Sequence, residues 1–344
     1  MLIVGPVAPP FGGMSVQSAL LERKLRETGV AARRLPTNPA LGLLAGVRFL
    51  RWVVSHARFM ISLVREVARS DVVHVLAASW FYFFARVAPS IVVARALRRR
   101  VIVNYRGGQA DAFLSRYGSW AVFFLTRAHV LTVPSPFLVR VFARHGLVAI
   151  EVPNIADLDR FRFRVRSTLQ PRILVNRNFT PVYNVALAVD AFARIRKARP
   201  DATLTLAGAG PLERSLRDHV DRLGLSGITF RGPVDNAEMA DLYDAHDLYL
   251  NPTDADNMPI SVLECLAAGV PVVSTNVGGI PDLLEHGADG VLVPPRDPDA
   301  MAAAVLALLD DQPFAARVIT AGVRKARAFG WAAVWPRLRR VYVP

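Results

Sequence analysis

Cysteine, long apolar runs and a leader-like start are missing or nearly missing from this chain. Its single cysteine, Cys265, excludes an internal disulfide framework and is typical of a reducing compartment. A membrane span needs about 20 uninterrupted apolar residues. The stretch nearest to that pattern, residues 41–64, is broken by Arg48, Arg51, His56 and Arg58. Residues 1–6 lack the basic start and cleavage site of a signal peptide. We therefore expect a cytoplasmic protein, with contact to a membrane surface left open.

Acidic residues are scarce in the first half of the chain only. Residues 1–165 hold 23 Lys/Arg and 8 Asp/Glu, whereas residues 166–344 hold 19 and 20, so the first half carries the whole net charge of +14. Such a field attracts anionic partners: phospholipid surfaces, lipid-linked phosphates or nucleic acid. Lys24 is the first half's only lysine, so a general preference for arginine is an alternative explanation of the composition, and both interpretations stay open.

Apolar runs alternate with amphipathic segments along the whole chain. The runs show no in–out alternation, which indicates strands buried on both faces. The expected strands are Leu2–Val7, Val72–Leu76, Val101–Asn104, Val130–Val133, Arg172–Val175, Thr203–Ala207, Ile228–Phe230, Leu248–Asn251, Val270–Ser274 and Val291–Val293. Helices such as Val185–Ala198, Pro211–Leu223 and Ala237–Ala245 lie between them. This alternation in both halves predicts an α/β protein with two doubly wound parallel, Rossmann-like sheets.

The length requires more than one domain, because single hydrophobic cores stop growing near roughly 250–300 residues. A charged run between Pro153 and Pro171 is the predicted linker, which places the first domain at 1–160 and the second at 161–328. Residues 41–69 fit the strand–helix alternation poorly, because they are both apolar and arginine-rich. They suit an interfacial helix or a helix that packs on the first sheet with its arginine stems along apolar surface.

One loop and helix carry the clearest chemistry. After the strand ending at Asn251, we expect Asp256 or Asn257 to cap a helix with Pro259 in its first position. The N–H groups of Ile260 and Ser261 would then lack intrahelical acceptors at the positive end of the helix dipole, which suits a phosphate.

Two carboxylates flank this expected phosphate position. Glu264 lies about four residues, or roughly 6 Å, further along the helix axis and would accept hydrogen bonds from sugar hydroxyls. Asp256 would bind a hydroxyl of a transferred sugar on the other side. An ordinary capped helix with a solvated glutamate is the alternative interpretation.

The acidic pair, with seven residues between its members, resembles the E-x7-E segment of glycosyltransferase family 4. Further segments resemble that family's landmarks in the same order, nearly from end to end. They are Pro10-Phe11-Gly12-Gly13, Val152-Pro153-Asn154, Leu206 to Leu212, Phe230 to Val234, Ala267 to Val273, Gly278 to Asp282, Gly290 to Pro294 and Trp331 to Tyr342.

The resemblance implies a GT-B fold, with two Rossmann-like domains facing a cleft and a C-terminal helix, 329–344, that crosses back to the first domain. It implies a retaining transferase that uses a nucleotide diphosphate sugar and needs no cofactor or metal. Without a cation, catalysis would depend on Arg177, helix N–H groups and glycine-loop amides to stabilise the leaving group. The implied donor-binding residues are Gly12, Gly13, Arg177, Tyr183, Val234, Asp256, Met258, Pro259, Ile260, Ser261 and Glu264.

Three positions depart from the family pattern. Tyr183 occupies the slot of a usual lysine and brings no charge, so a cation must come from elsewhere. Asp256 is one methylene shorter than the usual glutamate. Arg106 stands where a histidine is usual; an arginine is no base at neutral pH, but it can bind phosphate or a sugar hydroxyl. We expect Arg177, Asp256, Glu264 and Arg106 to be the catalytic residues.

These observations predict a hexosyltransferase-type glycosyltransferase that builds a cell-surface polysaccharide or a glycolipid. Its partners would be a nucleotide-sugar donor, a glycan or lipid-linked acceptor and, through the basic first domain, the anionic inner face of the cell membrane; we expect no nucleic-acid partner. A GT-B nucleotide-sugar 2-epimerase and a non-catalytic GT-B binding protein are the alternatives.

Overall fold

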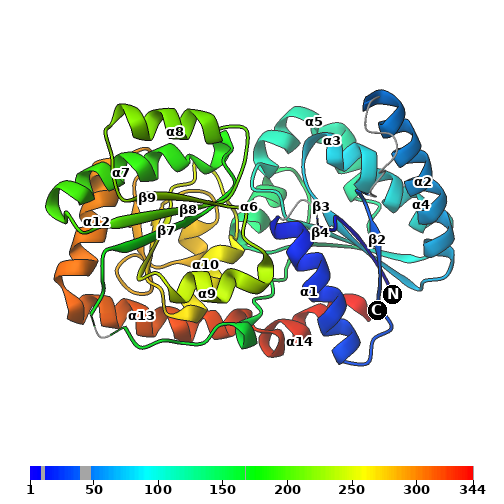
Figure 1. The fold of residues 1–344 in the computed structure, drawn as a ribbon. Helices are drawn as coiled ribbons and strands as arrows, with labels where there is room; N and C mark the ends of the chain where they lie inside the picture. The colour runs from blue at the N-terminus through cyan, green and yellow to red at the C-terminus, as the bar shows by residue number, and fades with distance from the viewer. Residues whose placement is uncertain (9–11, 39–47, 167, 344) are drawn as a thin grey trace. The chain divides into compact units, whose positions relative to one another are not determined.

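The structure is a computed structural model that describes residues 1–8, 12–38, 48–166 and 168–343, the side chains of residues 48–51 excepted (Figure 1). The chain divides into two compact units, Met1–Ile155 with Val334–Pro344, and Ala156–Ala333. The chain therefore passes from the first unit to the second at 155/156 and back again at 333/334. The boundaries predicted from the sequence were 160/161 and 328/329.

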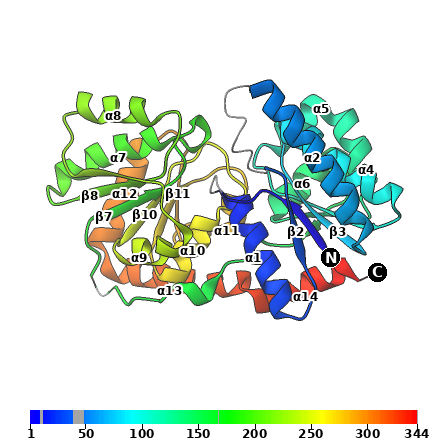
Figure 2. The same ribbon diagram turned by 45° about the vertical axis from the view of Figure 1, so that its right-hand side comes forward.

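The first unit is built on a six-stranded parallel sheet in the order β2-β1-β3-β4-β5-β6. Right-handed crossovers place α1 on one face and α2, α4 and α5 on the other (Figures 1 and 2). The strands are β1 (Leu2–Gly5), β2 (Arg33–Pro36), β3 (Val72–Ala77), β4 (Arg100–Tyr105), β5 (Val130–Val133) and β6 (Ile150–Glu151). The helices are α1 (Gly13–Glu27), α2 (Arg48–Ala68), α3 (Trp80–Tyr82), a π-helix (Phe83–Val87), α4 (Ala88–Ala96), α5 (Ala110–Leu125), α6 (Pro136–Arg144) and α14 (Trp331–Tyr342).

The second unit has its own six-stranded parallel sheet, in the order β12-β11-β10-β7-β8-β9. Its strands are β7 (Arg172–Asn176), β8 (Thr203–Ala207), β9 (Ile228–Gly232), β10 (Leu248–Asn251), β11 (Val272–Thr275) and β12 (Val291–Val293). Its helices are α7 (Val185–Ala198), α8 (Glu213–Arg222), α9 (Met239–Asp244), α10 (Ile260–Ala268), α11 (Ile280–Leu283), α12 (Pro298–Asp310) and α13 (Gln312–Ala326), with short 3₁₀ turns at Leu158–Arg160, Pro181–Tyr183, Asn236–Glu238 and Arg327–Phe329. The prediction of two doubly wound parallel sheets is confirmed.

Sequence patterns located the buried strands well and missed two edge strands. Val130–Val133, Thr203–Ala207, Leu248–Asn251 and Val291–Val293 have the predicted bounds, as does helix Val185–Ala198. Both missed strands, β2 and β6, end the first sheet and lack an apolar run. An edge strand has fewer buried neighbours, so its sequence need not be apolar on both faces.

Helix α2 accounts for most of the unusual 41–69 segment, of which residues 41–47 lie outside the described structure. Phe59, Leu63 and Val67 are fully or almost fully buried in the core of the first unit. The interpretation of a helix packed on the sheet is therefore confirmed. Its solvent face is nevertheless apolar too, with Ile61 71% and Val64 47% exposed.

Candidate functional site

Helix α10 begins one residue later than predicted and carries no side-chain cap. Pro259 is the residue before the helix, with an extended backbone (φ −68°, ψ 124°), and Ile260 is the first helical residue. The prediction that Asp256 or Asn257 caps the helix is wrong, because Asp256 Oδ1 instead accepts the N–H of Asn257 at 2.7 Å. The first N–H groups of α10, those of Ile260 and Ser261, thus keep free positions for an anion.

Arg177 lies beside this helix end, directly after β7. Its Nε and Nη2 atoms donate to Asn251 Oδ1 at 2.8 and 2.6 Å, and Nη2 lies 3.1 Å from Asp256 Oδ2. Burial acts to lower the pKa of this guanidinium, but Tyr249 and Asp256 outweigh it and raise the pKa above its ordinary value. Arg177 is therefore a permanent cation held by strand β10 and the loop after it.

Tyr183, in the slot of the expected lysine, packs against the same arginine. The guanidinium carbon of Arg177 lies 5.2 Å from the centre of the Tyr183 ring. Burial raises the pKa of the Tyr183 phenol, and Arg177 opposes that change only partly. The structure thus brings Arg177, Tyr183 and Asp256 together, and the tyrosine adds packing but no charge.

Glu264 is buried one turn into α10, with 7% of its surface exposed. Its Oε2 accepts the hydroxyl of Tyr243 at 2.8 Å, and that hydroxyl also accepts the Asn176 side-chain amide at 3.3 Å. Burial raises the pKa of Glu264 to about 7, although the Tyr243 hydrogen bond and Arg160 act in the opposite direction. The carboxyl group is therefore poised between its two protonation states near neutral pH.

A second tyrosine fixes the first turn of α10. Tyr249 is fully buried on β10, and its hydroxyl lies 2.9 Å from Ser261 Oγ and 3.2 Å from the carbonyl oxygen of Asn176. Sequence reasoning missed four supporting residues of this site, Tyr243, Tyr249, Asn176 and Asn251. Polar side chains at the carboxyl ends of the buried strands β7 and β10 were the available signal for the two asparagines.

Gly278 and Gly279, noted in the sequence only as a landmark, shape the loop that carries Asp256. A Cβ at Gly278, whose φ is +57°, would lie 2.0 Å from the carbonyl oxygen of Asp256. A Cβ at Gly279 would lie 2.2 Å from that of Asn257, and the Gly279 N–H donates to Asp256 O at 3.0 Å. Only glycine permits this close approach of two backbones.

Two predicted donor-binding residues use their side chains for packing. Met258 is buried, and Val234 is half-buried against the same hydrophobic cluster of the second unit. Their backbone groups are the parts that remain for a ligand.

In the first unit, the predicted glycine loop ends at helix α1, and its Pro10 and Phe11 lie outside the described residues. Gly12 precedes the helix with an extended backbone (φ −169°), and Gly13 is its exposed first residue. No described atom lies within 4 Å of a Cβ built on Gly12. Within the described structure, neither conformation nor packing therefore requires a glycine at 12. The space beside Gly12 is open to a ligand.

Arg106 follows β4 in the same unit and is bound by amides. Its guanidinium donates to Asn104 Oδ1 at 2.7 Å, to Gln17 Oε1 at 2.9 Å and to Asn154 Oδ1. Burial lowers the pKa of Arg106 to about 9, which leaves it charged at neutral pH. All three acceptors are neutral, so they do not compensate this positive charge, and one of them belongs to α1.

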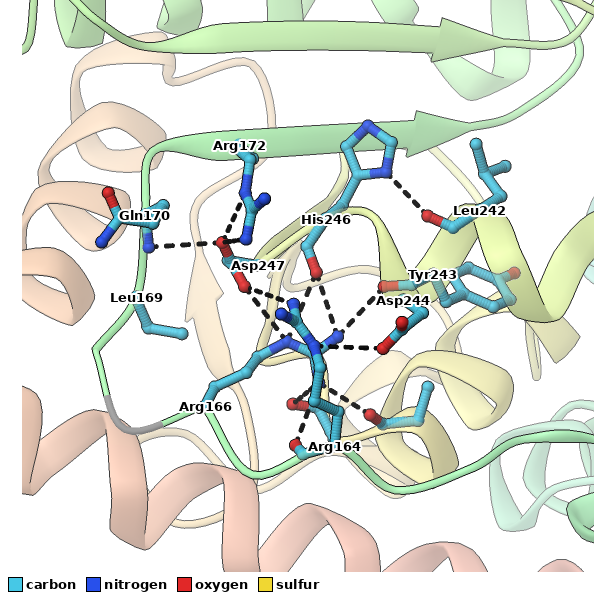
Figure 3. Close-up of polar contacts among 12 residues, drawn as sticks. Arg164, Arg166, Leu169, Gln170, Arg172, Leu242, Tyr243, Asp244, His246 and Asp247 are labelled. Atoms are coloured by element: carbon cyan, nitrogen blue, oxygen red, sulfur yellow. Dashed lines mark hydrogen bonds and ion pairs between the residues drawn. The ribbon is translucent and has the colours of Figure 1, made fainter.

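A network at the opposite end of the second sheet holds α9 and α10 (Figure 3). The buried guanidinium of Arg166 donates to the carbonyl oxygens of Ala268 at 2.8 Å and Gly269 at 3.0 Å, at the end of α10. It also donates to those of Tyr243 at 3.1 Å and His246 at 3.0 Å, at the end of α9, and lies 3.3 Å from Asp247. Arg166 therefore anchors the two helices that carry Tyr243 and Glu264, and no local sequence pattern indicates this role.

Comparison with known proteins agrees with this geometry. Residues 170–311, within the second unit, match the family model described as "Glycosyl transferases group 1". The chain is 31% identical over 207 residues to the phosphatidyl-myo-inositol mannosyltransferase of Mycobacterium tuberculosis, a match that covers 57% of this chain and 54% of that protein. It is 38% identical over 128 residues to the D-inositol 3-phosphate glycosyltransferase of Thermobispora bispora, covering 37% and 30%. The chain thus spans about half the length of the curated mannosyltransferase that it matches.

Two solved structures share the whole fold. The Anabaena protein HepE, crystallised with UDP and glucose, superposes with a TM-score of 0.77 at 17% identity, covering 98% of each chain. The sucrose-phosphate synthase of Thermosynechococcus elongatus gives a TM-score of 0.80 at 19% identity, covering 99% and 97%. The chain therefore has the GT-B fold, and its residues 170–311 are similar to a glycosyl transferases group 1 domain.

Proposed function

We propose that this protein is a retaining, metal-independent glycosyltransferase of family 4 type that transfers a hexosyl group from a nucleotide diphosphate sugar to a hydroxyl acceptor. One observation carries the proposal: the uncapped amino end of α10 lies beside Arg177, with the buried Glu264 one turn further in. The diphosphate binds the helix N–H groups and Arg177. Glu264 accepts the nucleoside hydroxyls, and Asp256 accepts a hydroxyl of the sugar.

The chemistry that follows needs no nucleophile from the enzyme. The bond between the anomeric carbon and the phosphate oxygen breaks, while the acceptor oxygen bonds to the same face of the sugar. The acceptor proton passes to a phosphate oxygen of the leaving group. Arg177 and the N–H groups of Ile260 and Ser261 stabilise the negative charge that develops on the nucleoside diphosphate.

The acceptor we propose is a glycan or a lipid-linked glycan of the cell surface. The names of the relatives support a hydroxylated acceptor, since one is a mannosyltransferase of phosphatidyl-myo-inositol and another a glycosyltransferase of inositol 3-phosphate. The first unit would bind this acceptor, and the uncompensated Arg106 suits a phosphate or a hydroxyl there.

Peripheral contact with an anionic membrane completes the proposal. Val53, Ile61 and Val64 recur at helical spacing on α2 and are 39%, 71% and 47% exposed. Arg58 and Arg65 lie beside this stripe and form no ion pair with a described residue. An apolar stripe bordered by arginines suits an anionic lipid surface. No helix among the described residues is both long and apolar enough to cross a membrane.

Sedimentation with phosphatidylglycerol vesicles tests the membrane contact. The double variant Arg58→Gln/Arg65→Gln and the variant Ile61→Ser should both bind less. Arg217→Gln, which removes an exposed arginine from α8 of the second unit, is the control. Equal binding by all three variants and the original chain would refute the contact.

Thermal stabilisation by UDP, GDP, ADP and their sugars tests the transferase itself. We expect one base to raise the melting temperature, and Glu264→Gln to reduce that rise while the surface control Glu213→Gln does not. Stabilisation by none of these nucleotides would refute the proposal. Isomerisation of the donor in the absence of an acceptor would identify an epimerase instead.

A further inference from the structure

Trp80 has a backbone conformation that a bulky residue rarely adopts. Its φ is +63°, in the left-handed region that favours glycine. It begins the short helix α3, and the π-helix Phe83–Val87 follows at once. Strained residues persist where the surrounding structure or a function requires them, and π-helices occur often at functional sites. This segment therefore has two unfavourable backbone features within eight residues.

The strained residue lies where open parallel sheets bind ligands. Strand β3 ends at Ala77, and its neighbours in the sheet are β1 and β4. The chain leaves β1 toward one edge of the sheet and leaves β3 toward the other, so the switch point of the topology lies between these strands. Ligands of such sheets bind outside the carboxyl ends of the strands at the switch point.

The indole ring is held in place by its neighbours. Its Nε1–H donates to Gln109 Oε1 at 2.8 Å, on the surface. Its ring stands nearly perpendicular to those of Phe113 and Tyr117, at centroid distances of 5.8 and 6.1 Å. Trp80 itself is only half-buried. A rigid, half-exposed indole beside an amide is a suitable platform for the ring of a polar ligand.

The loop after β4 completes this platform. Gln109 is exposed, its Oε1 accepts the indole N–H, and its side-chain amide N–H groups donate to no described residue. Gly107 packs closely on the preceding loop, because a Cβ there would lie 3.0 Å from Ser79 Oγ. Ser79 in turn bonds the buried Tyr105 hydroxyl at 2.6 Å. The ends of β3 and β4 are thus fixed to one another around Trp80.

We propose that Trp80 and Gln109 form an acceptor subsite that takes a polyhydroxylated ring, a pyranose or a cyclitol. The apolar C–H face of the ring stacks on the indole, and a ring hydroxyl accepts an N–H from Gln109. The strained backbone presents the indole in the orientation that the ring requires. This inference rests on the proposed transferase function, because it assigns the acceptor side of the same reaction.

Ligand-observed NMR titration of the full chain, saturated with the nucleotide that binds best, tests the subsite. The probes are methyl α-D-mannopyranoside, methyl α-D-glucopyranoside and myo-inositol. We expect at least one to bind, and Trp80→Gly to weaken it about tenfold. Trp80→Phe should retain part of the affinity and Gln109→Ala should lose a few-fold. Trp120→Ala, which removes a 66% exposed tryptophan from α5, should change nothing.

The outcomes separate the subsite from the function on which it rests. If no nucleotide binds the original chain, the proposed function fails. If a nucleotide binds but no probe does, or if Trp80→Gly, Trp80→Phe and Gln109→Ala all leave probe affinity unchanged, the subsite is wrong. If Trp80→Gly fails to fold, the probe affinities of Trp80→Phe and Gln109→Ala, each relative to the original chain, decide whether the subsite exists. Nucleotide affinity should stay the same in every folded variant, and a parallel loss of both affinities would indicate a merely structural role.

Discussion

Replacement of Glu264 by glutamine should change stability and nucleotide affinity in opposite directions. The pKa of the buried carboxyl is about 7 in the folded chain, against 4.5 for an ordinary glutamate. The folded state therefore binds this proton more tightly than the unfolded state does. The resulting stabilisation is fully present below pH 4.5 and is lost as the pH rises through 7.

The size of the effect follows from the two pKa values. At about 1.4 kcal/mol per pKa unit, the difference corresponds to roughly 3.5 kcal/mol, of which about 2.5 kcal/mol is lost between pH 5 and pH 8. Glutamine does not titrate, and its carbonyl oxygen can still accept the Tyr243 hydroxyl. Between pH 5 and pH 8, the free energy of unfolding of the variant should therefore rise by about 2.5 kcal/mol relative to that of the original chain.

Urea unfolding at pH 5, 6, 7 and 8 measures that gain as the difference in unfolding free energy between the variant and the original chain, with Glu213→Gln on α8, a partly exposed glutamate, as the comparison variant. A Glu264→Gln offset that is the same at all four pH values would refute the buried, proton-binding carboxyl. Nucleotide binding should respond in the other direction, because sugar hydroxyls donate best to an ionised carboxylate. We expect affinity about 10- to 100-fold weaker for the variant at pH 8, and original-chain affinity that falls as the pH drops below 7.

Three further predictions concern the residues that hold the loop before α10 and the helix itself in place. Gly279→Ala places a Cβ 2.2 Å from the carbonyl oxygen of Asn257 and should weaken nucleotide binding at least about tenfold by calorimetry, while a retained affinity would show that the loop can move at little cost. Arg177→Gln leaves Asp256 without its cation and should cost about 3–5 kcal/mol in urea unfolding, which Asp256→Asn in the same chain should partly restore. Arg166→Gln should lower the melting temperature strongly, and Arg166→Lys should lower it less. Equal melting temperatures for the two variants would show that the carbonyl contacts of Arg166 do not cause the loss of stability.

Sequence patterns predicted the architecture, and the same physical reason makes part of the grouping of the candidate site residues predictable. Strands buried on both faces are recognisable as continuous apolar runs, and residues that follow neighbouring parallel strands meet at one edge of the sheet. Arg177 follows β7 and Asp256 follows β10, and these two strands are hydrogen-bonded neighbours. That the two side chains lie close together was therefore predictable, and they are 3.1 Å apart. The hydrogen bond between Tyr243 and Glu264 was not, because it depends on how two helices pack, which no local pattern records.

The tyrosine at 183 gives the packing of α10 particular importance. A lysine in that slot would attract a diphosphate from many orientations, because a point charge is not directional. Here Arg177 is paired with Asp256, and Tyr183 adds no charge. If the proposed function is right, a larger part of phosphate recognition falls on the N–H groups of α10, which bind only in the direction of the helix axis. The contacts that orient this helix, those of Arg166 at its carboxyl end included, should thus control donor affinity more than any single charge does.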